Sequence, residues 1–472
     1  MNPQHRVIVV RSFDPQLAEI RFGYGVSPEY PAPPDVQAML SGLTEPDVIA
    51  ERFPIQSFHD FRSRMVEVSE QVTIRRKNRG TPLAAEARKR RNVLNKEARE
   101  DVAVWLGHTM LRRAHTETAF RERIVAFWAD HFTAMGKRGV IRRGTSPYIE
   151  DAIRPFIAGK FEELLTEAVT HPLMVDYLDQ RVSIGPNSQR AERIGENRKV
   201  GLNENLAREL LELHTLGVDG PYSQTDVTEL AELLTGLTFD ARNGMKFQKR
   251  LAEPGAETVL GVTYSETANL DTVRSVLADL ARHPATARHI ATKLAVHFGS
   301  DTPDPALIDA MEAAFIAHDG ALMPVYEALL SHPSVWTREL SNIKPPIDFM
   351  SSAIRALAVP PAAFADREQR WIRRIFMQPL FNMGQRWETP SGPDGWAEED
   401  PEWITPQGLA LRVTWAMAFP GELVDPLPDP RDFVDHALGD FATEPVRFAA
   451  AAAETRSEAI GLVLMSPAFQ RR

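Results

Sequence analysis

The sequence predicts an all-α protein, built over residues 1–472 as one large multi-helical domain with a small β-hairpin excursion near 237–264. Apolar residues recur at three- and four-residue spacing along most of the chain, and helix formers dominate. Hydrophobic residues make up 43% of the chain, enough for a sizeable core. The interruptions at 26–35, 181–200, 387–407 and 419–432 are rich in Pro, Gly or polar residues, and none resembles a long flexible linker.

Composition excludes several kinds of site and partner. The chain has no cysteine, which removes disulfides, thiolate nucleophiles, Cys-ligated zinc and iron–sulfur clusters. Its net charge of −10 argues against general nucleic-acid binding. No stretch approaches the roughly 20 apolar residues of a spanning helix, and residues 1–25 contain only the short apolar run 7–10. As written, we expect a cytoplasmic protein without a membrane span, unless a misassigned start codon hides an export signal.

Residues 75–99 form a basic run, with ten Lys or Arg residues against Glu86 and Glu97. Such a run fits a site for phosphate or an anionic polymer. It also fits a solvated charged helix, or a helix packed against acidic surface elsewhere in this acidic chain. We favour one of the last two interpretations.

Four apolar helical stretches end at a His-Pro or Ser-Pro step. The prolines are Pro172, Pro284, Pro333 and Pro467. Proline suits the first turn of a new helix, and a preceding His or Ser can cap backbone groups at the break. We therefore expect helix–turn–helix corners here, and we do not expect their histidines to be catalytic.

The stretch 116–135 predicts a helix with a histidine inside its apolar stripe. On a helical wheel His131 falls among Phe120, Phe127 and Trp128. A buried imidazole needs a hydrogen-bond partner from another element. His131 is therefore either a satisfied core histidine or a catalytic base, a metal ligand, or a haem or flavin contact.

The stretch 202–217 predicts a helix with Asn203 as its N-cap and Gly217 just after its end. One face carries charged residues at four-residue steps, which indicates a structural salt-bridge ladder. These residues are Glu204, Arg208 and Glu212. On the wheel, Glu209 falls between apolar positions and is expected to point into the core, where its carboxylate needs a partner or a proton. Together with His131 it suits acid–base or metal chemistry, and equally a structural buried pair.

The stretch 223–236 opens with Ser223 three residues before Asp226, a close relative of the capping box. Asp226 is therefore expected to start this helix rather than to catalyse. The sequence contains no H-E-x-x-H, G-x-S-x-G or Walker A motif.

Three runs carry a family resemblance: RERIVAFWADHF (121–132), NENLARELLELHTLGVDGPYSQTDVTELAELLTG (203–236) and HPATARHIATKLAVHFGSDTP (283–303). Shorter supporting pieces include YLDQ (177–180), GW (395–396) and SPAFQRR (466–472). Through these runs the chain, from about residue 21 to the C-terminus, resembles a bacterial family catalogued as domain of unknown function 1800.

The resemblance implies a mainly helical protein with no established reaction. Many members of the family are exported, and their genes often neighbour those of an alkaline-phosphatase- or sulfatase-like family, which implies a partner of that type. Positions matching the family's recurrent polar residues are Trp128, His131, Asn203, Glu204, Asn205, Arg208, Glu209, Glu212, Asp226 and Lys293. This chain departs from the family in an insertion-like stretch at 184–199 and in the loss of a His and a Lys within 251–261.

The first functional hypothesis is a hydrolytic enzyme acting on a phosphate or sulfate ester, with or without a divalent metal. Its catalytic residues would be His131, Glu209 and Arg208, and a helix N-terminus at 203–208 would favour an anionic ligand. Ligand-binding residues would be Trp128, Asn203, Glu204, Asn205, Asp226 and Lys293. The sequence leaves the cofactor and the identity of any metal open.

The second hypothesis is a non-catalytic accessory or scaffold protein that works with an alkaline-phosphatase- or sulfatase-like partner. The stretches 181–200 and 387–407 would then form the contact surface. Three tryptophans of the second stretch would be interface anchors or sugar-stacking platforms. Alternatively, they are buried and only hold the loop in place locally. They are Trp387, Trp396 and Trp403.

Overall fold

The structure, a computed structural model, describes residues 13–194, 201–365 and 367–472. Helices account for 65% of the chain, and the strands form only two small antiparallel sheets among the described residues. The predicted all-α class is therefore confirmed. The apolar run at 7–10 lies outside the described residues.

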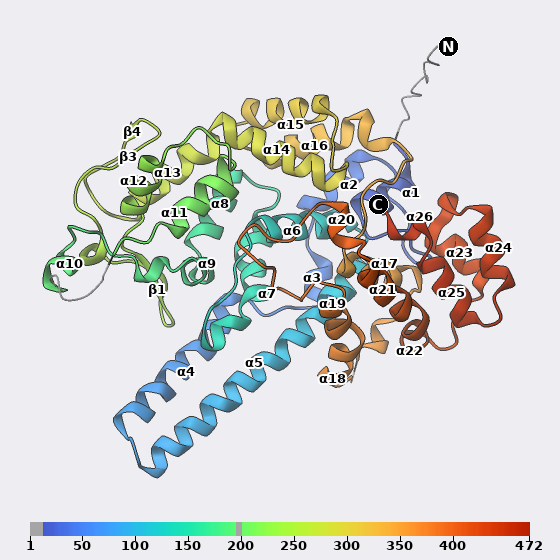
Figure 1. The fold of residues 1–472 in the computed structure, drawn as a ribbon, viewed down its shortest axis with the longest axis horizontal. Helices are drawn as coiled ribbons and strands as arrows, with labels where there is room; N and C mark the ends of the chain where they lie inside the picture. Colours follow the sequence, from blue (N-terminus) through green and yellow to red (C-terminus); the bar gives the residue numbers. More distant parts are fainter. Residues whose placement is uncertain (1–12, 195–200, 366) are drawn as a thin grey trace.

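The first part of the chain folds into helices that end at His131. They are α1 (Pro15–Leu17), α2 (Val36–Thr44), α3 (Val48–Arg52), α4 (Phe58–Lys77), α5 (Pro82–His115) and α6 (Ala119–His131). Helices α4 and α5 form a long antiparallel hairpin that projects from the body (Figure 1). Its turn contains Gly80 in the left-handed region, and the side chains of Ser57 and Thr81 cap the two helix starts.

The middle of the chain holds further helices and both sheets. The helices are α7 (Thr145–Tyr148), α8 (Phe161–Thr170), α9 (Pro172–Tyr177), α10 (Gln189–Ile194), α11 (Asn205–Glu209), α12 (Gln224–Leu233), α13 (Leu270–Arg282), α14 (Pro284–Phe298), α15 (Pro305–Ala317) and α16 (Leu322–Ser331). The strands are β1 (Leu237–Asp240), β2 (Gly244–Phe247), β3 (Thr258–Val259) and β4 (Val262–Thr263). Each sheet is one hairpin, β1 with β2 and β3 with β4, as predicted for 237–264.

The C-terminal helices gather at one end of the molecule, drawn in orange and red in Figure 1. They are α17 (Pro346–Ala356), α18 (Gln369–Ile372), α19 (Gln378–Asn382), α20 (Asp400–Trp403), α21 (Pro406–Ala418), α22 (Pro420–Leu423), α23 (Pro430–Leu438), α24 (Glu444–Ala452), α25 (Arg456–Leu464) and α26 (Pro467–Gln470).

The four predicted proline corners are confirmed. Pro172, Pro284 and Pro467 open α9, α14 and α26, and Pro333 opens a short 3-10 turn. At Pro172 the preceding His171 is the N-cap, and its Nδ1 accepts a hydrogen bond from a backbone N–H two residues on, at 3.1 Å. An imidazole that accepts in this way is a structural cap.

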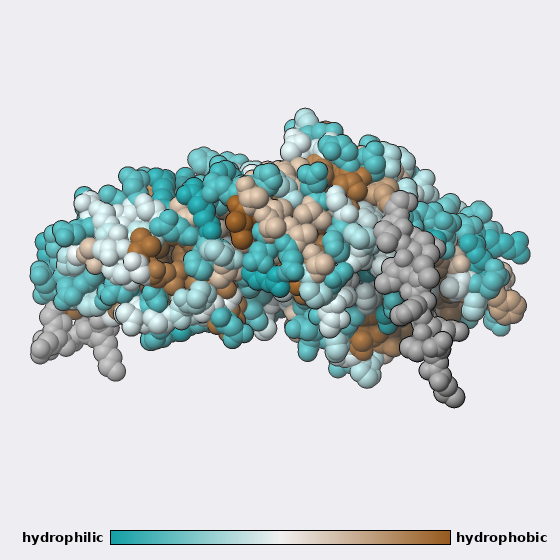
Figure 2. Space-filling view, turned by 90° about the horizontal axis from the view of Figure 1, so that it is seen from above, coloured by the Kyte–Doolittle hydropathy of each residue, from teal (hydrophilic) through white to brown (hydrophobic). Residues whose placement is uncertain are grey.

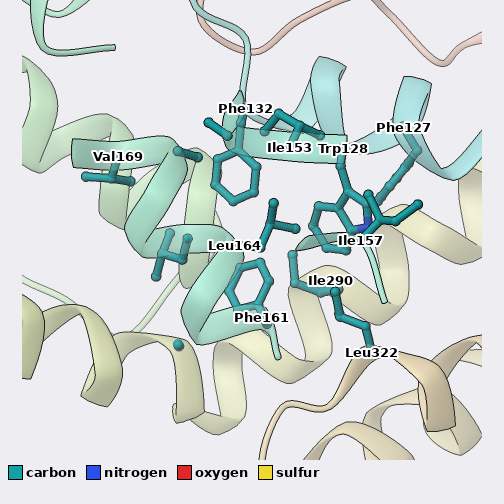
Figure 3. Close-up of a cluster of buried hydrophobic side chains, with 14 of the residues drawn as sticks. Phe127, Trp128, Phe132, Ile153, Ile157, Phe161, Leu164, Val169, Ile290 and Leu322 are labelled. Carbon is teal, nitrogen blue, oxygen red and sulfur yellow. The ribbon is translucent and has the colours of Figure 1, made fainter. Parts of the chain in front are cut away.

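Among the described residues, two large hydrophobic cores and one small cluster of Ile49, Phe53 and Leu111 hold the fold together. The first is built around α6, α8 and α14, where Trp128, Phe161 and Ile290 pack together (Figure 3). The second joins α17, α21, α23 and α25, with Phe349 and Trp415 in edge-to-face contact. Helix α5 contributes apolar side chains to both cores. Whether the two cores form one domain, as the sequence predicts, stays a prediction.

The surface offers no broad apolar face in the view of Figure 2, where apolar residues form small separate patches within a mostly hydrophilic surface. Among the described residues, no helix combines the length and the apolar character needed to cross a bilayer.

The helix predicted over 202–217 differs from the expectation in one respect. It begins at Asn205 as α11 and continues from Leu210 to Thr215 as a π-helical turn. Hydrogen bonds to the fifth residue rotate the later positions, so His214 is buried while Leu213 is half-exposed. The wheel that placed Glu209 in the core assumed an unbroken α-helix, and Glu209 is in fact half-buried.

Candidate active site

Two opposite faces of helix α6 have different surroundings. One face packs into the first core, and the other carries Arg123, Ala126 and Asp130 at helical spacing along the wall of a cavity of about 180 Å³, with Thr133 just after the helix end. The cavity lies between the two cores, because core residues from each line it. Its remaining wall includes residues of α5, α7, the segment 149–154, α14, α17, α19 and the segment 385–398, together with Ile55, Pro345 and Arg472.

The cavity lining is unusually charged for an interior surface. It includes six arginines, Arg112, Arg113, Arg123, Arg154, Arg386 and Arg472, and six carboxylic residues, Glu122, Asp130, Glu150, Asp348, Glu388 and Glu398. Most of these charges are paired with one another, as buried charges must be. Arg112 contacts Glu150 at 2.7 Å, and Arg154 contacts Glu122 at 2.7 Å.

Asp348 is the anion at the centre of this network. It is 6% exposed and pairs with Arg113 at 3.2 Å, with Arg123, and with Arg472 at 3.6 Å. Burial would raise the pKa of its carboxyl, but the arginines outweigh that effect and lower the pKa below its usual value. Asp348 is therefore a permanent anion that fixes the arginines in place.

Asp130 has a different environment, because it forms no ion pair within 4 Å among the described residues. Burial raises the pKa of its carboxyl to about 7, although the Trp396 N–H donates a hydrogen bond to its Oδ1 at 2.9 Å. Gly395 permits this approach: it has φ +84°, and a Cβ there would lie 2.6 Å from Asp130 Oδ2. Asp130 can therefore gain and lose a proton near neutral pH.

Glu388 is a second carboxyl of this kind. Burial raises its pKa to about 7, against the effect of the Ser146 hydroxyl, which donates a hydrogen bond to Oε1. Its backbone has φ +49°, a conformation that is costly for a residue with a side chain and that concentrates at functional sites. The fold thus holds Glu388 in a strained position that directs it to the cavity lining.

His297 also lines the cavity, but its ring nitrogens are both engaged. Nδ1 donates to Glu398 Oε1 at 2.7 Å. Nε2 accepts from Arg123 at 3.2 Å and from Arg472 at 3.4 Å, so its lone pair is occupied. His297 therefore orients the arginines and is a poor candidate for a proton acceptor in this arrangement.

Several buried donors around the cavity have no hydrogen-bond partner among the described residues. They are the Nε atoms of Arg123, Arg154 and Arg472 and the Nε1 atom of Trp387. Buried donors are rarely left unpaired, and an acceptor-rich group in the cavity would satisfy those that face it. This arrangement suits a small anionic ligand.

His131 is buried, as predicted, but it lies outside the cavity lining. It is 2% exposed, and its Nε2 donates to the His214 carbonyl at 3.3 Å. Burial, Lys293 and nearby His214 hold its pKa well below the usual value, so the ring stays neutral. The buried Trp128 donates to the Tyr326 hydroxyl at 2.7 Å. Both residues serve the first core in this structure.

Glu209 and Arg208 also lie outside the cavity lining. Burial, followed by Glu212 and Asp394, raises the pKa of Glu209. Arg208 contacts Glu204 at 3.2 Å and Glu212 at 3.3 Å, which confirms the predicted ladder. Neither Glu209 nor His131 lines the cavity, and their joint role in acid–base or metal chemistry stays a prediction.

The remaining residues of this motif organise helix starts. Asn203 does not cap α11 in the predicted position, but its Oδ1 accepts from the Asn205 N–H at 2.9 Å. Asp226 completes the predicted capping box: its Oδ2 accepts from the Ser223 N–H at 2.8 Å, and the Ser223 Oγ accepts from the Asp226 N–H at 3.3 Å. Asp226 also accepts from the Ser223 hydroxyl at 2.6 Å and from the Leu260 N–H at 2.7 Å. The oxygens of Asp226 are thus already engaged.

Lys293 is the predicted residue whose charge acts on carboxyls of the cavity, although it is not among the lining residues. It lies half-buried on α14. Its positive charge opposes the rise that burial causes in the pKa of Asp130, and it helps to lower the pKa of Glu398. The same charge helps to lower the pKa values of His131 and His214. The charge of Lys293 therefore acts on His131, and also on Asp130, which the sequence did not single out.

The sequence contained a signal for the cavity. Ala126 and Ala129 lie beside charged residues on a helix whose opposite face is apolar apart from His131, and small residues beside charges indicate a second face that packs against protein rather than a solvent face. The three tryptophans of 387–407 differ in their surroundings, and only Trp403 is fully buried. Trp403 is buried and donates to a backbone carbonyl at 2.9 Å, while Trp387 and Trp396 line the cavity.

A metal site is not preformed in the described part of the chain, where no group of three or more His, Asp or Glu side chains is arranged to hold an ion. The acidic residues of the cavity are instead divided between ion pairs and the two carboxyls with raised pKa values.

The fold and the cavity define a helical protein with a charged, partly open cavity between two hydrophobic cores. The chain belongs to the family described as protein of unknown function (DUF1800), whose sequence profile matches residues 18–471. No curated protein and no solved structure matches the chain. The resemblance found from the motifs is therefore confirmed over nearly the whole chain.

Proposed function

We propose that the protein is an enzyme that hydrolyses a small anionic ester, of the phosphate or sulfate class, through acid–base catalysis by Asp130 and Glu388. One observation carries this proposal: both carboxyls line one arginine-rich cavity, and both have pKa values of about 7. General acids and bases work best when their pKa lies near the working pH.

The chemistry requires opposite protonation states in the two carboxyls. The ionised one accepts a proton from water as the water oxygen bonds to phosphorus or sulfur. The protonated one donates its proton to the leaving oxygen as the ester bond breaks. Arg123 and Arg472 at the cavity wall stabilise the negative charge of the transferring group.

This scheme predicts a narrow pH profile. Only molecules in which the base is ionised and the acid is protonated are active. With both pKa values at about 7, these are about a quarter of all molecules at pH 7. The fraction falls to about one percent at pH 5 and at pH 9, so we expect activity to fall roughly 25-fold at either pH.

The test is hydrolysis of nitrophenyl phosphate and nitrophenyl sulfate by the wild-type chain, Asp130→Asn, Glu388→Gln and Glu327→Gln. We expect the first two variants to lose roughly 10²- to 10⁴-fold in kcat. Glu327→Gln is the control, because Glu327 is exposed on α16 and distant from the cavity lining.

Full activity in Asp130→Asn and Glu388→Gln would overturn the assignment. If Glu209→Gln lost activity while Asp130→Asn and Glu388→Gln kept it, the result would support the catalytic residues predicted from the sequence, Glu209 and His131. Elemental analysis of the active protein tests for a divalent metal. If the wild-type protein turns over neither ester, the proposed substrate class is wrong.

A second candidate function is that of a non-catalytic accessory or scaffold protein for an alkaline-phosphatase- or sulfatase-like partner. The observation that favours it is the pairing of most cavity charges within the chain, as in a purely structural network. Size-exclusion chromatography of the chain mixed with such an enzyme tests this candidate. Separate elution, together with ester hydrolysis by the chain alone, contradicts it.

A further inference from the structure

The basic run at 75–99 forms the far end of the α4–α5 hairpin, which projects from the body (Figure 1). Six of its cations are exposed and surround the turn; we call them the basic tip. They are Arg75, Arg76, Lys77, Arg79, Arg88 and Lys89. No ion pair within the described residues involves them, whereas Arg90 contacts Glu67 and Glu97. The basic tip is therefore a solvated helix end, as one of the two favoured interpretations predicts, while Arg90 further along the run pairs with acidic Glu67 of α4.

The charge of the tip contrasts with that of the rest of the chain. Ten basic and two acidic residues give 75–99 a net charge of +8, which leaves −18 for the remainder of a chain whose total is −10. From Pro82 to Asn95, beside which Gly139 of the body lies, α5 rises about 20 Å, more than twice the Debye length of about 8 Å at physiological salt. On α4 the body comes closer, because the β1–β2 hairpin lies beside Thr73 and Ile74 and Arg242 contacts Glu70 at 2.6 Å. The acidic body therefore weakens the field least at the turn itself and at the start of α5.

An exposed apolar residue accompanies the cations. Leu83 is 49% exposed directly after the turn, next to the exposed Pro82. Between the two helices, by contrast, the projecting part buries only small or aliphatic side chains, Ala87 and Leu94. An uncovered leucine at the extreme end of a cationic hairpin adds nothing to binding phosphates along a nucleic-acid strand. It fits the boundary between lipid headgroups and acyl chains.

We propose that the basic tip docks the protein on the surface of an anionic lipid bilayer, with the cations among the headgroups and Leu83 entering the interface. Each Lys or Arg at such a surface strengthens binding by roughly fivefold. The projection of the hairpin then holds the acidic body away from the like-charged membrane. The cavity lies in the body rather than in the hairpin tip.

The experiment is co-sedimentation of the full chain with vesicles of phosphatidylcholine alone or mixed with phosphatidylglycerol. We expect binding only to the phosphatidylglycerol vesicles, and release when NaCl is raised from about 0.1 to 0.5 M. Changing Arg75, Arg76, Lys77 and Arg79 together to Gln should weaken binding at least tenfold. Leu83→Ser should weaken it by a few fold at unchanged charge.

The matched control carries the same change in net charge elsewhere. Arg250, Arg274, Arg431 and Arg456 are exposed residues of the body, and their joint change to Gln should leave vesicle binding unchanged. Circular dichroism checks that both quadruple variants keep their helices. Equal losses in the two variants, or no binding of the wild-type chain to phosphatidylglycerol vesicles, would overturn the proposal. If the chain bound duplex DNA or RNA through the basic tip and did not bind vesicles, the partner of the tip would be a nucleic acid and the membrane proposal would be wrong.

Discussion

Replacing Asp130 by Asn removes a charge that the cavity disfavours, and we expect the change to stabilise the fold above neutral pH. The pKa of this carboxyl rises from 3.8 to about 7, chiefly because of burial. Below pH 3.8 the folded and unfolded chains are both protonated there, so the effect vanishes. Between pH 3.8 and 7 the unfolded chain releases a proton that the folded protein keeps, and folding weakens as the pH rises.

The size of the effect follows from the two pKa values. At roughly 1.36 kcal/mol per pH unit, the interval from 3.8 to about 7 gives an upper limit of about 4 kcal/mol at pH 8. Asn keeps an oxygen that can accept the Trp396 N–H, so the hydrogen bond is retained. For a chain of 472 residues, the unfolding entropy converts this free energy into a rise in Tm of about 4 °C.

The assay is urea unfolding of the wild-type chain and Asp130→Asn at pH 4, 6 and 8. We expect equal stability at pH 4 and a growing advantage of the variant toward pH 8. The control is Asp432→Asn, the same change at an exposed carboxyl outside the cavity. A variant less stable than wild type at pH 8 would refute the reasoning, because Lys293 would then stabilise an ionised Asp130.

Three further predictions concern the cavity and its surroundings. Asp348→Ala leaves buried arginines without their anion and should cost about 3–5 kcal/mol in urea unfolding. Burial lowers the pKa of His214 to about 3, so the folded state loses stability as the pH falls below 6.5. His214→Phe should narrow the stability difference between pH 7.5 and pH 5 by about 2 kcal/mol. Gly395→Ala places a Cβ against Asp130 and should reduce ester hydrolysis, whereas Gly384→Ala, which meets no atom within 4 Å at a similar positive φ, should not.

Features that depend on near neighbours in the sequence were predicted correctly. The capping box of Ser223 and Asp226 spans three residues, and the ladder through Arg208 uses four-residue steps. The proline corners likewise need only the residue before each proline. In each case the interaction that stabilises the local structure is present in a short segment, so the pattern alone predicts it.

The cavity depends on contacts that no short segment contains. Asp130 receives its hydrogen bond from Trp396, 266 residues further along the chain. The helical wheel selected His131 because it lies in the apolar stripe, while the neighbouring Asp130 faces the other way. Glu209 was misplaced because a π-helical turn follows it, and amino-acid periodicity assumes an uninterrupted α-helix.

The membership of α5 in both cores has a consequence for synthesis of the chain. Its side that carries Leu106 and Met110 belongs to the second core, whose other helices begin with α17 at Pro346. About 230 residues separate the end of α5 from that point, which takes about 10 to 50 s at ribosomal rates. During this interval the apolar side of α5 has no partner, so the half-made chain is the form of this protein most prone to aggregate.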